Sequence, residues 1–579
     1  MPRRPVSSLQ SLAIAIVFIL LTPLSSPAQS NASQSPWWKH AVIYEIYPRS
    51  FQDTNGDGIG DINGITSRLD YLKQLGINAI WITPVYPSPQ VDFGYDISNY
   101  EAIDPQFGTM ADFDRLVREA KRRGIRVIMD FVINHTSDQH PWFLASRSSR
   151  TNPKRDWYIW RDGKNGGPPN NWLSWFGHSA WTLDPTTNQY YYHYFYPQQP
   201  DLNWRNPQVQ KAMFDVVRFW LNHGAAGFRI DAVSRLFEDS NLHDDPILPG
   251  TNAYGDPNIE HKYTDNLPEV HDVLRELRRI VDGYLGSPVL ISEADEPSIA
   301  ELTKMYGAHR DEIQLPMDFQ IADVNRLSAP TFRKLLDEVE TNSAGGWPEY
   351  FFSNHDQPRQ WDRYGDGVQN DQIAKLMAAL LLTPRATPQM YYGEELGMRT
   401  TPPARKEDVK DPIGKIGWPK EKGRDGERTP MQWNSSQNAG FSTAAKPWLP
   451  VPPSAAKYNV TAEEKDPNSI LSFYKRLLAL RHSQSALLNG DYVDLNRDDP
   501  DVLSFLRKNP GKGDSIVVAL NMSAQTKSIA FDLSQKGIRS AMASPLLIAP
   551  EPKNLRKPPA VPLNHVILPP FAVFIAAVR

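Results

Sequence analysis

The chain of 579 residues contains no cysteine, so its stability cannot rely on disulfide bonds. It also lacks an excess of charge of one sign: 62 Lys and Arg stand against 66 Asp and Glu, a formal net charge of −4. This balance argues against a nucleic acid or an anionic membrane surface as the partner. After about residue 28, no apolar run is long enough to cross a bilayer.

The first 28 residues have the pattern of an export signal. Arg3 and Arg4 supply positive charge, residues 12–24 form a short apolar core, and residues 26–28 offer a small-residue cleavage site. The alternative is an uncleaved membrane anchor, but the core is short for a spanning helix and a threonine and a proline interrupt it. We therefore expect an exported protein, periplasmic or extracellular, with no membrane attachment after cleavage.

Beyond the signal, short apolar segments alternate with amphipathic helical segments. One such helix is expected to start after Thr109, a favourable N-cap, and to run to about residue 123. Eight segments are predicted to be strands: 41–47, 79–82, 125–130, 227–231, 289–293, 313–319, 350–353 and 388–392. Eight alternating units favour an α/β fold of the closed (β/α)8 TIM barrel type over an open doubly wound sheet.

Two irregular stretches and a change of pattern set the predicted domain boundaries. Residues 134–203, rich in Trp, Tyr, Asn, Pro and Gly, are too long for a structureless loop and predict a subdomain inserted after the third strand. The barrel would then comprise residues 36–133 and 204–487, with a further long insertion near its end. Short strands beyond residue 488 predict a C-terminal antiparallel β-domain over 488–579.

Three acidic residues, Asp231, Glu293 and Asp356, each stand at the end of a predicted strand. Carboxyl ends of parallel barrel strands meet on one rim, where barrel enzymes carry their catalytic groups. Three carboxylates converging in an apolar barrel would be costly as structure alone, so a functional cluster is favoured.

Two neighbouring groups have both structural and functional interpretations. Arg229 leaves the strand on the same face as Asp231, either as a buried ion pair or as a group that keeps the pKa of a nucleophilic aspartate low. His135, after the third strand, is either structural or a neutral donor to a substrate hydroxyl, and its place on the rim favours binding.

A glycine-rich turn over residues 53–61 places oxygen-bearing groups at alternate positions. It resembles the first half of a calcium-binding loop, although Gly64 stands where the closing glutamate belongs. A metal-free Asx turn is the alternative. The sequence favours a structural Ca²⁺, with Mg²⁺ possible and no organic cofactor, and the expected ligands are Asp53, Asn55, Asp57, Ile59 and Asp61.

Ordered motifs along nearly the whole mature chain resemble glycoside hydrolase family 13, the α-amylase superfamily. The matching segments are 130–135 (DFVINH), 199–203 (QPDLN), 227–231 (GFRID), Glu293, 354–356 (NHD), 393–398 (GEELGM) and 428–433 (RTPMQW). The second and last of these look like the α-glucosidase and oligo-1,6-glucosidase branch. Residues 41–61 and 136–143 look especially like insect-type maltases.

The resemblance implies a role for each site residue. Asp231 would be the nucleophile, Glu293 the general acid/base, and Asp356 the group that grips sugar hydroxyls near the transition state. The subsite for the terminal glucose would be formed by Asp92, Tyr95, His135, Arg229, His355 and Arg428. In this branch the residue after the nucleophile correlates with linkage, and Ala232 favours α-1,4 over α-1,6.

The activity implied is that of a retaining, exo-acting α-glucosidase on short oligosaccharides. Retention predicts that the carboxyl groups of Asp231 and Glu293 lie about 5–5.5 Å apart, against roughly 6.5–9.5 Å for inversion. Two alternatives remain open: an isomerase or transglucosidase of the trehalose synthase or sucrose isomerase type, and a non-catalytic glucosidase-like partner protein. The protein is expected to be a monomer or a dimer.

Overall fold

The computed structural model describes residues 35–343, 345–511, 513–551 and 559–579, so the predicted export signal lies outside the described residues. Residues 37–579 form one compact unit. Among the described residues, no helix has both the length and the apolar character needed to span a bilayer.

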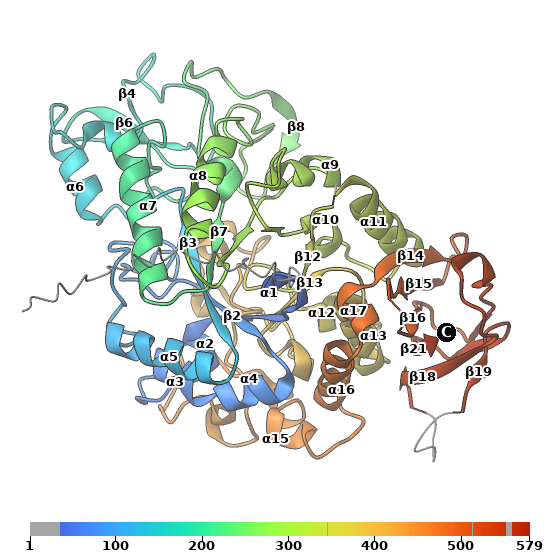
Figure 1. Ribbon diagram of the computed structural model, residues 1–579. Helices are drawn as coiled ribbons and strands as arrows, with labels where there is room; N and C mark the ends of the chain where they lie inside the picture. Colours follow the sequence, from blue (N-terminus) through green and yellow to red (C-terminus); the bar gives the residue numbers. More distant parts are fainter. Residues whose placement is uncertain (1–34, 344, 512, 552–558) are drawn as a thin grey trace, which may run out of the picture. The chain divides into compact units, whose positions relative to one another are not determined.

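Eight parallel strands form the central sheet, as predicted (Figure 1). In chain order they are β1 (Ile43–Ile46), β2 (Ala79–Ile82), β3 (Arg126–Val132), β7 (Gly227–Asp231), β10 (Val289–Ser292), β11 (Leu315–Pro316), β12 (Glu349–Tyr350) and β13 (Thr387–Tyr391). Hydrogen bonds connect them in the order β11-β10-β7-β3-β2-β1-β13-β12, and a single parallel bridge between Met317 and Glu349 closes the ring. The closed (β/α)8 barrel is therefore confirmed.

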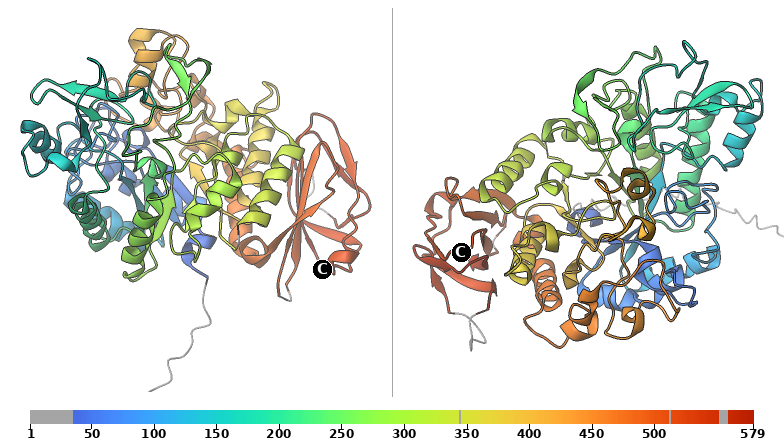
Figure 2. Two further views of the ribbon diagram at one scale, coloured as in Figure 1. Left: turned by 90° about the horizontal axis from the view of Figure 1, so that it is seen from above. Right: turned by 180° about the vertical axis from the view of Figure 1, so that it is seen from behind.

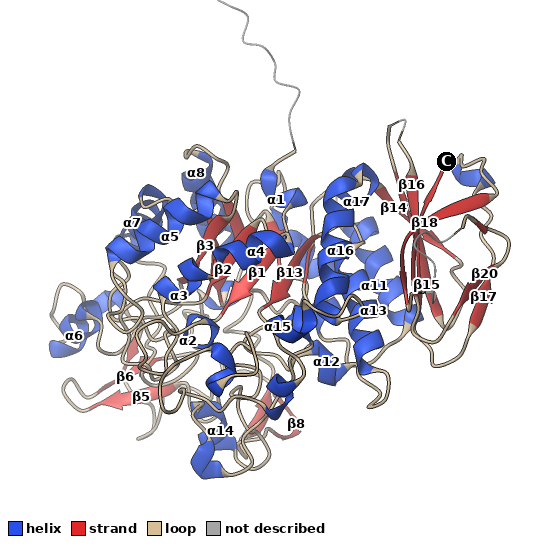
Figure 3. Cartoon of the chain, turned by 90° about the horizontal axis from the view of Figure 1, so that it is seen from below, coloured by secondary structure: helices blue, strands red, loops and turns tan. Residues whose placement is uncertain are grey.

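Helices between the strands cover the outside of the barrel (Figures 1 and 3). The principal ones are α3 (Ile62–Ser67), α4 (Leu69–Leu75), α5 (Met110–Arg122), α7 (Pro207–Asn222), α8 (Val270–Asp282), α11 (Ala329–Asn342), α13 (Asn370–Leu382) and α16 (Ile470–Ser483). Thr109 and Asp112 form a reciprocal capping box at the start of α5, as the N-cap prediction required. The segment between β1 and β2 forms two successive helices, α3 and α4, because Arg68 leaves the helical conformation (φ −103°, ψ 5°) and turns its guanidinium to Gln52.

The insertion after β3 has its own small sheet, β4 (Trp160–Arg161), β6 (Gln189–Tyr192) and β5 (Trp181–Asp184), all antiparallel. Its aromatic residues form a local core that includes Trp172, Trp181 and Tyr194. It also contains α6 (Pro141–Ser148), which the sequence pattern did not predict. A further unpredicted element is the hairpin β8 (Ile247–Thr251) and β9 (Pro257–Ile259), in the long loop after β7.

The C-terminal region is an antiparallel β-domain, as predicted (Figure 2). Its larger sheet has the order β14 (Asp491–Leu495), β15 (Val502–Lys508), β16 (Ser515–Asn521), β21 (Val573–Val578), β18 (Met542–Ala549) and β19 (Val561–Pro562). A second sheet pairs β17 (Lys527–Ile529) with β20 (Val566–Leu568). Residues of β15 and β16 alternate between the main core and a second core inside this domain, so both faces of the larger sheet are buried.

Candidate active site

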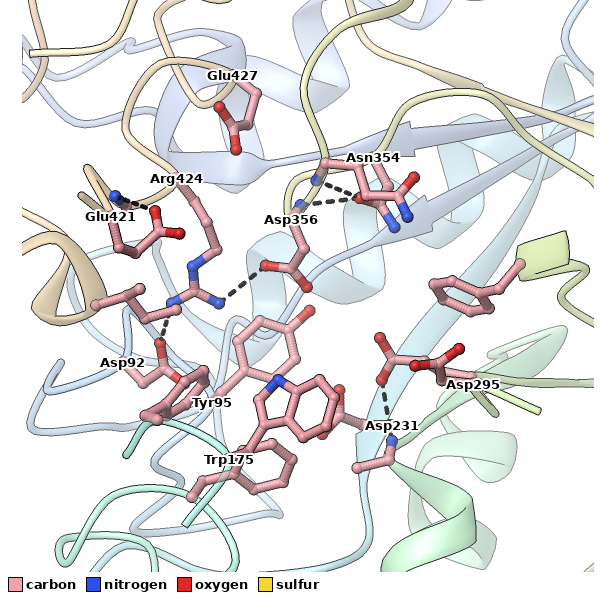
Figure 4. A pocket seen from close by; sticks show the side chains of 18 of the residues that line it. Asp92, Tyr95, Trp175, Asp231, Asp295, Asn354, Asp356, Glu421, Arg424 and Glu427 are labelled. Atoms are coloured by element: carbon pink, nitrogen blue, oxygen red, sulfur yellow. Dashed lines mark hydrogen bonds and ion pairs between the residues drawn. The ribbon is translucent and has the colours of Figure 1, made fainter. Parts of the chain in front are cut away.

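A cavity of about 670 Å³ lies at the carboxyl ends of the barrel strands (Figure 4). The predicted residues that line it are Asp92, Tyr95, His135, Asp231, Glu293 and Asp356. The other three predicted site residues, Arg229, His355 and Arg428, are at most 1% exposed and contact the lining carboxylates from behind. All nine therefore belong to one cluster, and these three buried groups contact four of the lining residues, namely Asp231, Glu293, Asp356 and Tyr95.

The Arg229 guanidinium is shared by three carboxylates. Its Nη1 donates to Asp231 Oδ1 at 2.6 Å and lies 3.2 Å from Asp130 Oδ1, and its Nη2 lies 2.8 Å from Glu293 Oε1. This geometry follows from the order of the strands. Arg229 and Asp231 leave the same face of β7. The strand β3, which contains Asp130, pairs with one edge of β7, and β10, which ends just before Glu293, pairs with the other. The three carboxylates offset the free-energy cost of removing the Arg229 guanidinium from water.

The charge balance around Arg229 differs from the prediction. Burial raises the pKa of Asp231 well above its usual value, and the negative charges of Glu293 and Asp130 add to the rise while Arg229 opposes it. Burial likewise raises the pKa of Asp130 to about 6. The expectation that Arg229 keeps the pKa of Asp231 low is wrong, because one cation cannot offset burial together with two neighbouring carboxylates.

The backbone next to Asp231 also contacts Glu293. Ala232 adopts a left-handed conformation (φ 45°, ψ 40°), and its N–H donates to Glu293 Oε2 at 3.0 Å. Glu293 is thus held from two sides, by this N–H and by Arg229. Its carboxyl group has a fixed orientation toward the cavity that Asp231 also lines.

Asp356, in the loop after β12, lies between two arginines that come from the long segment after β13. Its Oδ1 is 2.6 Å from Arg428 Nη2 and 2.9 Å from Arg424 Nη1. Burial alone would raise the pKa of Asp356, but His355, Arg424 and Arg428 reverse this and hold the pKa well below its usual range. Asp356 therefore stays ionised to lower pH than Asp231, whose pKa burial raises.

His355 is a neutral group beneath Asp356. Its Nδ1 lies 2.7 Å from Glu45 Oε1, and burial raises the pKa of Glu45 and lowers that of His355, in each case far from the usual value. His355 Nε2 lies 2.8 Å from Tyr95 Oη and 3.2 Å from Asp356 Oδ2. The ring therefore connects Glu45, Tyr95 and Asp356 beneath the pocket.

The opposite wall contains Asp92, His135 and Gln199. Gln199 Nε2 lies 3.0 Å from His135 Nε2 and 3.3 Å from Asp92 Oδ2, so one amide connects the two. Burial lowers the pKa of His135 to about 3, which keeps the ring neutral. Arg424 closes this wall, because its Nη2 lies 2.7 Å from Asp92 Oδ1 while its Nη1 reaches Asp356 (Figure 4).

Comparisons with known proteins agree with this geometry. The sequence profile described as the α-amylase catalytic domain matches residues 45–490. The chain belongs to the α-amylase family, glycoside hydrolase family 13. It is 45% identical over 507 residues to a probable α-glucosidase of Rhizobium meliloti, covering 85% of this chain and 91% of that protein. It is 40% identical over 528 residues to the oligo-1,6-glucosidase of Parageobacillus thermoglucosidasius, again covering 85% and 91%.

Solved structures of the family are similar over almost the whole chain. The trehalulose synthase MutB from Pseudomonas mesoacidophila MX-45 has a TM-score of 0.85 and 37% identity, and the likeness covers 94% of this chain and all of that one. Together with the named glucosidases, these relatives place this α-amylase family enzyme in the α-glucosidase branch of the glycoside hydrolases.

Several lining residues of this family 13 enzyme had no predicted role. Gln199 belongs to the family segment 199–203, but nothing in the sequence indicated a contact with His135. Arg424 precedes Arg428 by four residues in an insertion without regular periodicity, so only the fold shows that both reach Asp356. Five aromatic lining residues also had no predicted role: Trp175, Phe176 and Phe195 of the inserted subdomain, Tyr254 of the β8–β9 hairpin, and Phe319 at the start of α10 (Phe319–Ala322).

The predicted metal loop has the donor types that a hard cation prefers, carboxylates and an amide. In the structure Asp53 accepts from the backbone N–H groups of Asn55, Gly56 and Gly58, and Asp61 caps α3. Among the described residues, no three His, Cys, Asp or Glu side chains are arranged as a metal-binding group. A carboxylate retains lone pairs beyond these hydrogen bonds, and calcium at this loop stays a prediction.

Proposed function

We propose that the enzyme is a retaining, exo-acting α-glucosidase that removes terminal glucose from short α-linked sugars, with α-1,4 linkages favoured. The observation that carries the proposal is the Arg229 fork, which bridges Asp231 and Glu293. One guanidinium that contacts both groups favours the short carboxyl separation of a retaining site over the wider one of an inverting site, which must hold a water beside the intact substrate.

In the proposed reaction Glu293 protonates the glycosidic oxygen while Asp231 attacks the anomeric carbon. The bond to the leaving sugar breaks as the glucosyl–Asp231 ester forms. Glu293, now a carboxylate, then takes a proton from water, which displaces Asp231 and releases glucose with its α-configuration retained. Asp356, an anion held by Arg424 and Arg428, would accept hydrogen bonds from glucose hydroxyls that strengthen as the ring distorts.

The exo-action follows from the charged wall at one end of the pocket. The Arg424 guanidinium joins Asp92 to Asp356 and is fixed by Asp411 at 2.8 Å. We infer that this wall leaves room for only one glucose unit of the substrate at that end of the pocket. Tyr95, His135 and Gln199 would supply the remaining contacts to that unit, which makes short sugars the substrates and polymers poor ones.

Product analysis tests the proposal. Maltose, isomaltose, sucrose, trehalose and soluble starch are incubated with the enzyme, and the products are followed over time. The expected result is α-glucose from maltose, little action on starch, and loss of activity by at least about a thousandfold in Asp231→Asn. Asp323→Asn, which removes another pocket carboxylate, is the matched control and retains activity. Unchanged maltose hydrolysis by Asp231→Asn contradicts the proposal.

A second candidate is an isomerase or transglucosidase that uses the same three carboxylates. The structural likeness to a trehalulose synthase favours it. The same assay separates the two, because a new disaccharide formed from sucrose without free glucose supports isomerisation, whereas glucose accumulating with each bond broken supports hydrolysis.

We further propose that the loop over 53–61 binds a structural Ca²⁺ and that residues 1–28 direct export and are then removed. The loop lies away from the three carboxylates in sequence and follows a different strand, so chelation is expected to lower the melting temperature more than the initial activity. Melting curves with EDTA, with Ca²⁺ restored and with Asp57→Asn test the first point. Mass determination of the mature N-terminus tests the second.

A further inference from the structure

Glu349 is a buried acid of β12 that the proposed mechanism does not use. Its side chain is fully buried, and neither of its carboxyl oxygens has a hydrogen-bond partner among the described residues. A polar group buried without a hydrogen bond costs free energy, and buried polar groups are normally paired with protein or with ordered water. The two unpaired oxygens therefore indicate a ligand small enough to enter the space around this side chain.

The strand pattern places the Glu349 side chain in the barrel interior. Alternate residues of a strand leave opposite faces, and Phe351, two residues later, belongs to a small apolar core together with Met317. Met317 is also the residue that bridges to Glu349 where the ring closes. Tyr350, between the two, instead belongs to the main core. Glu349 therefore points into the same interior as Arg229 of β7.

Two further side chains of this interior have an unpaired polar atom. Arg229 directs both terminal nitrogens to carboxylates, but its Nε has no hydrogen-bond partner in the described part of the chain. Gln389 of β13 donates to Glu45 Oε2 at 3.3 Å, and within the same residues its Oε1 is unpaired. Gln389 leaves the same face of β13 as Thr387, which is the ladder partner of Glu349. Three side chains from three strands thus have unpaired atoms inside one barrel.

Arg229 is also the charged group that acts on Glu349. Burial raises the pKa of Glu349 well above its usual value, and among the described charged groups Arg229 is the one that opposes this rise. The other carboxyl groups of the interior, Glu45 on β1 and Asp130 on β3, affect each other's surroundings but not the pKa of Glu349. Glu349 therefore keeps its proton to higher pH than an exposed glutamate. A protonated carboxyl group has both an O–H donor and a carbonyl acceptor.

We propose that a water molecule bound between Glu349, Gln389 and Arg229 Nε fixes the guanidinium, which makes Glu349 a positioning residue. Water fits as the ligand because it both donates and accepts, and a buried water typically makes about three hydrogen bonds. Arg229 Nε would donate to the water, which would donate to Gln389 Oε1 and to the carbonyl oxygen of Glu349. The inference rests on the proposed function, because the same guanidinium bridges Asp231 and Glu293.

The proposed water would restrain the part of the guanidinium that protein groups leave free. The two terminal nitrogens are held by carboxylates, and the guanidinium carbon lies 4.9 Å from the centre of the Trp81 ring. Because the guanidinium is a rigid plane, a third contact at Nε would fix its tilt. A tilted Arg229 would shift Asp231 relative to Glu293, and a misplacement of about 1 Å in such a site can cost about a hundredfold in rate.

Two substitutions at Glu349 test the inference by steady-state kinetics on maltose. Glu349→Met removes the acceptor and should fold, because an apolar group replaces an unpaired polar one. Its kcat should fall about tenfold while KM stays within about twofold, since the sugar contacts of Asp356 and His135 remain. The acid limb of kcat/KM should move to higher pH, because a less firmly held Arg229 stabilises the Asp231 anion less. Glu349→Gln, which keeps an acceptor, should restore both kcat and the limb.

Thr387→Val is the matched control. Thr387 pairs with Glu349 in the ladder, but its hydroxyl donates to Trp38 O at 2.7 Å and accepts from Trp347 Nε1 at 3.0 Å. The valine variant loses a buried hydrogen bond next to the proposed water site, so its melting temperature should fall while kcat and the acid limb stay in place. Equal kinetic changes in Thr387→Val and Glu349→Met would indicate a general loss of barrel rigidity and would overturn the inference.

A high-resolution crystal structure of the wild-type protein checks the water directly. It should show a water about 2.7–3.2 Å from Glu349, Gln389 Oε1 and Arg229 Nε, and Glu349→Met should lack it. A wild-type structure without this water, or wild-type kcat in Glu349→Met, overturns the inference and leaves the proposed function standing. An acid limb that moves to lower pH in Glu349→Gln also overturns it, because a charged Glu349 would then compete for Arg229. A wild-type enzyme that releases glucose from no substrate overturns the proposed function itself.

Discussion

At the scale of single residues, Ala232 has a left-handed backbone conformation next to the proposed nucleophile. It follows Asp231 directly, adopts φ 45°, and donates its N–H to Glu293. The resemblance to the α-glucosidase branch implies that valine at this position accompanies α-1,6 preference. A β-branched residue is poorly suited to positive φ, so under the proposed function a valine here would couple linkage choice to backbone strain.

We predict that Ala232→Val destabilises the protein by about 1–2 kcal/mol through this strain. The ratio of activity on isomaltose to that on maltose should rise at the same time. Thermal unfolding measures the first effect and initial rates on the two sugars measure the second. Ala232→Gly, which tolerates positive φ, should show no such loss of stability. A fully stable valine variant would show that the left-handed conformation is not retained.

Asp130 offers a test of the charge balance around Arg229. The negative charge of Asp130 helps to raise the pKa of Asp231, which must be ionised to act as a nucleophile. Activity should therefore fall with decreasing pH as Asp231 gains its proton. Asp130→Asn removes one negative charge and frees Arg229 for Asp231, so the acid limb of kcat/KM should move to lower pH. The pH profile on maltose checks this, and Asp323→Asn should leave the limb in place.

At the scale of elements, the sequence predicted all eight barrel strands because each combines apolar residues with turn signals at its ends. The strands β11 and β12 have only two residues each, although longer segments were predicted. The prediction was too long because apolar residues next to these strands, such as Phe351 and Phe352, are buried without pairing to a neighbouring strand. Helix α6 and the β8–β9 hairpin were missed because both lie in long insertions and lack a clear hydrophobic period. Tyr254 was missed with its hairpin.

The contact between α16 and the turn after β13 carries an unusual pH dependence. Tyr474 donates to Glu394 Oε1 at 3.0 Å, and burial raises the pKa of Glu394 from 4.5 to about 8. The folded state thus keeps a proton that the unfolded chain loses near pH 4.5. This contribution to stability is complete below that pH and is lost as the pH rises through about 8.

We therefore predict that Glu394→Gln reduces the loss of stability between about pH 5 and pH 8. The glutamine keeps a group that can accept from Tyr474, so the variant should fold. Melting temperatures over this pH range give the measurement, with the exposed Glu101→Gln as the control. If the slope for Glu394→Gln equals that of the wild type, Glu394 is not the group that titrates.

At the scale of the whole molecule, buried arginines join the barrel to the C-terminal β-domain. Arg507 of β15 donates to Thr383 O at 2.6 Å, beyond the end of α13, and to Gly490 O at 2.8 Å. Arg333 of α11 donates to Val502 O at 2.7 Å. These guanidinium groups satisfy carbonyl oxygens that would otherwise be buried without a partner.

Arg507→Met should lower the free energy of unfolding by about 2–3 kcal/mol, because the side chain keeps its volume but leaves two carbonyl groups unpaired. Urea unfolding measures the loss, and kcat on maltose should be unchanged in the folded protein. Lys508→Met, the exposed neighbour on the same strand, is the matched control and should have little effect. A loss of activity without a loss of stability would contradict a purely structural role for Arg507.

The closure of the barrel has a consequence for how such a site diverges. Asp231 ends β7 and Glu293 directly follows β10, its ladder-paired neighbour, so the backbone constrains their separation. Asp356 follows β12, which meets β11 through the single bridge of Met317 and Glu349, and its position depends on the side chains of Arg424 and Arg428. Under the proposed mechanism, bond cleavage and sugar recognition are built from parts that can be inherited separately: loop substitutions could change which sugar is held while Asp231 and Glu293 keep their spacing.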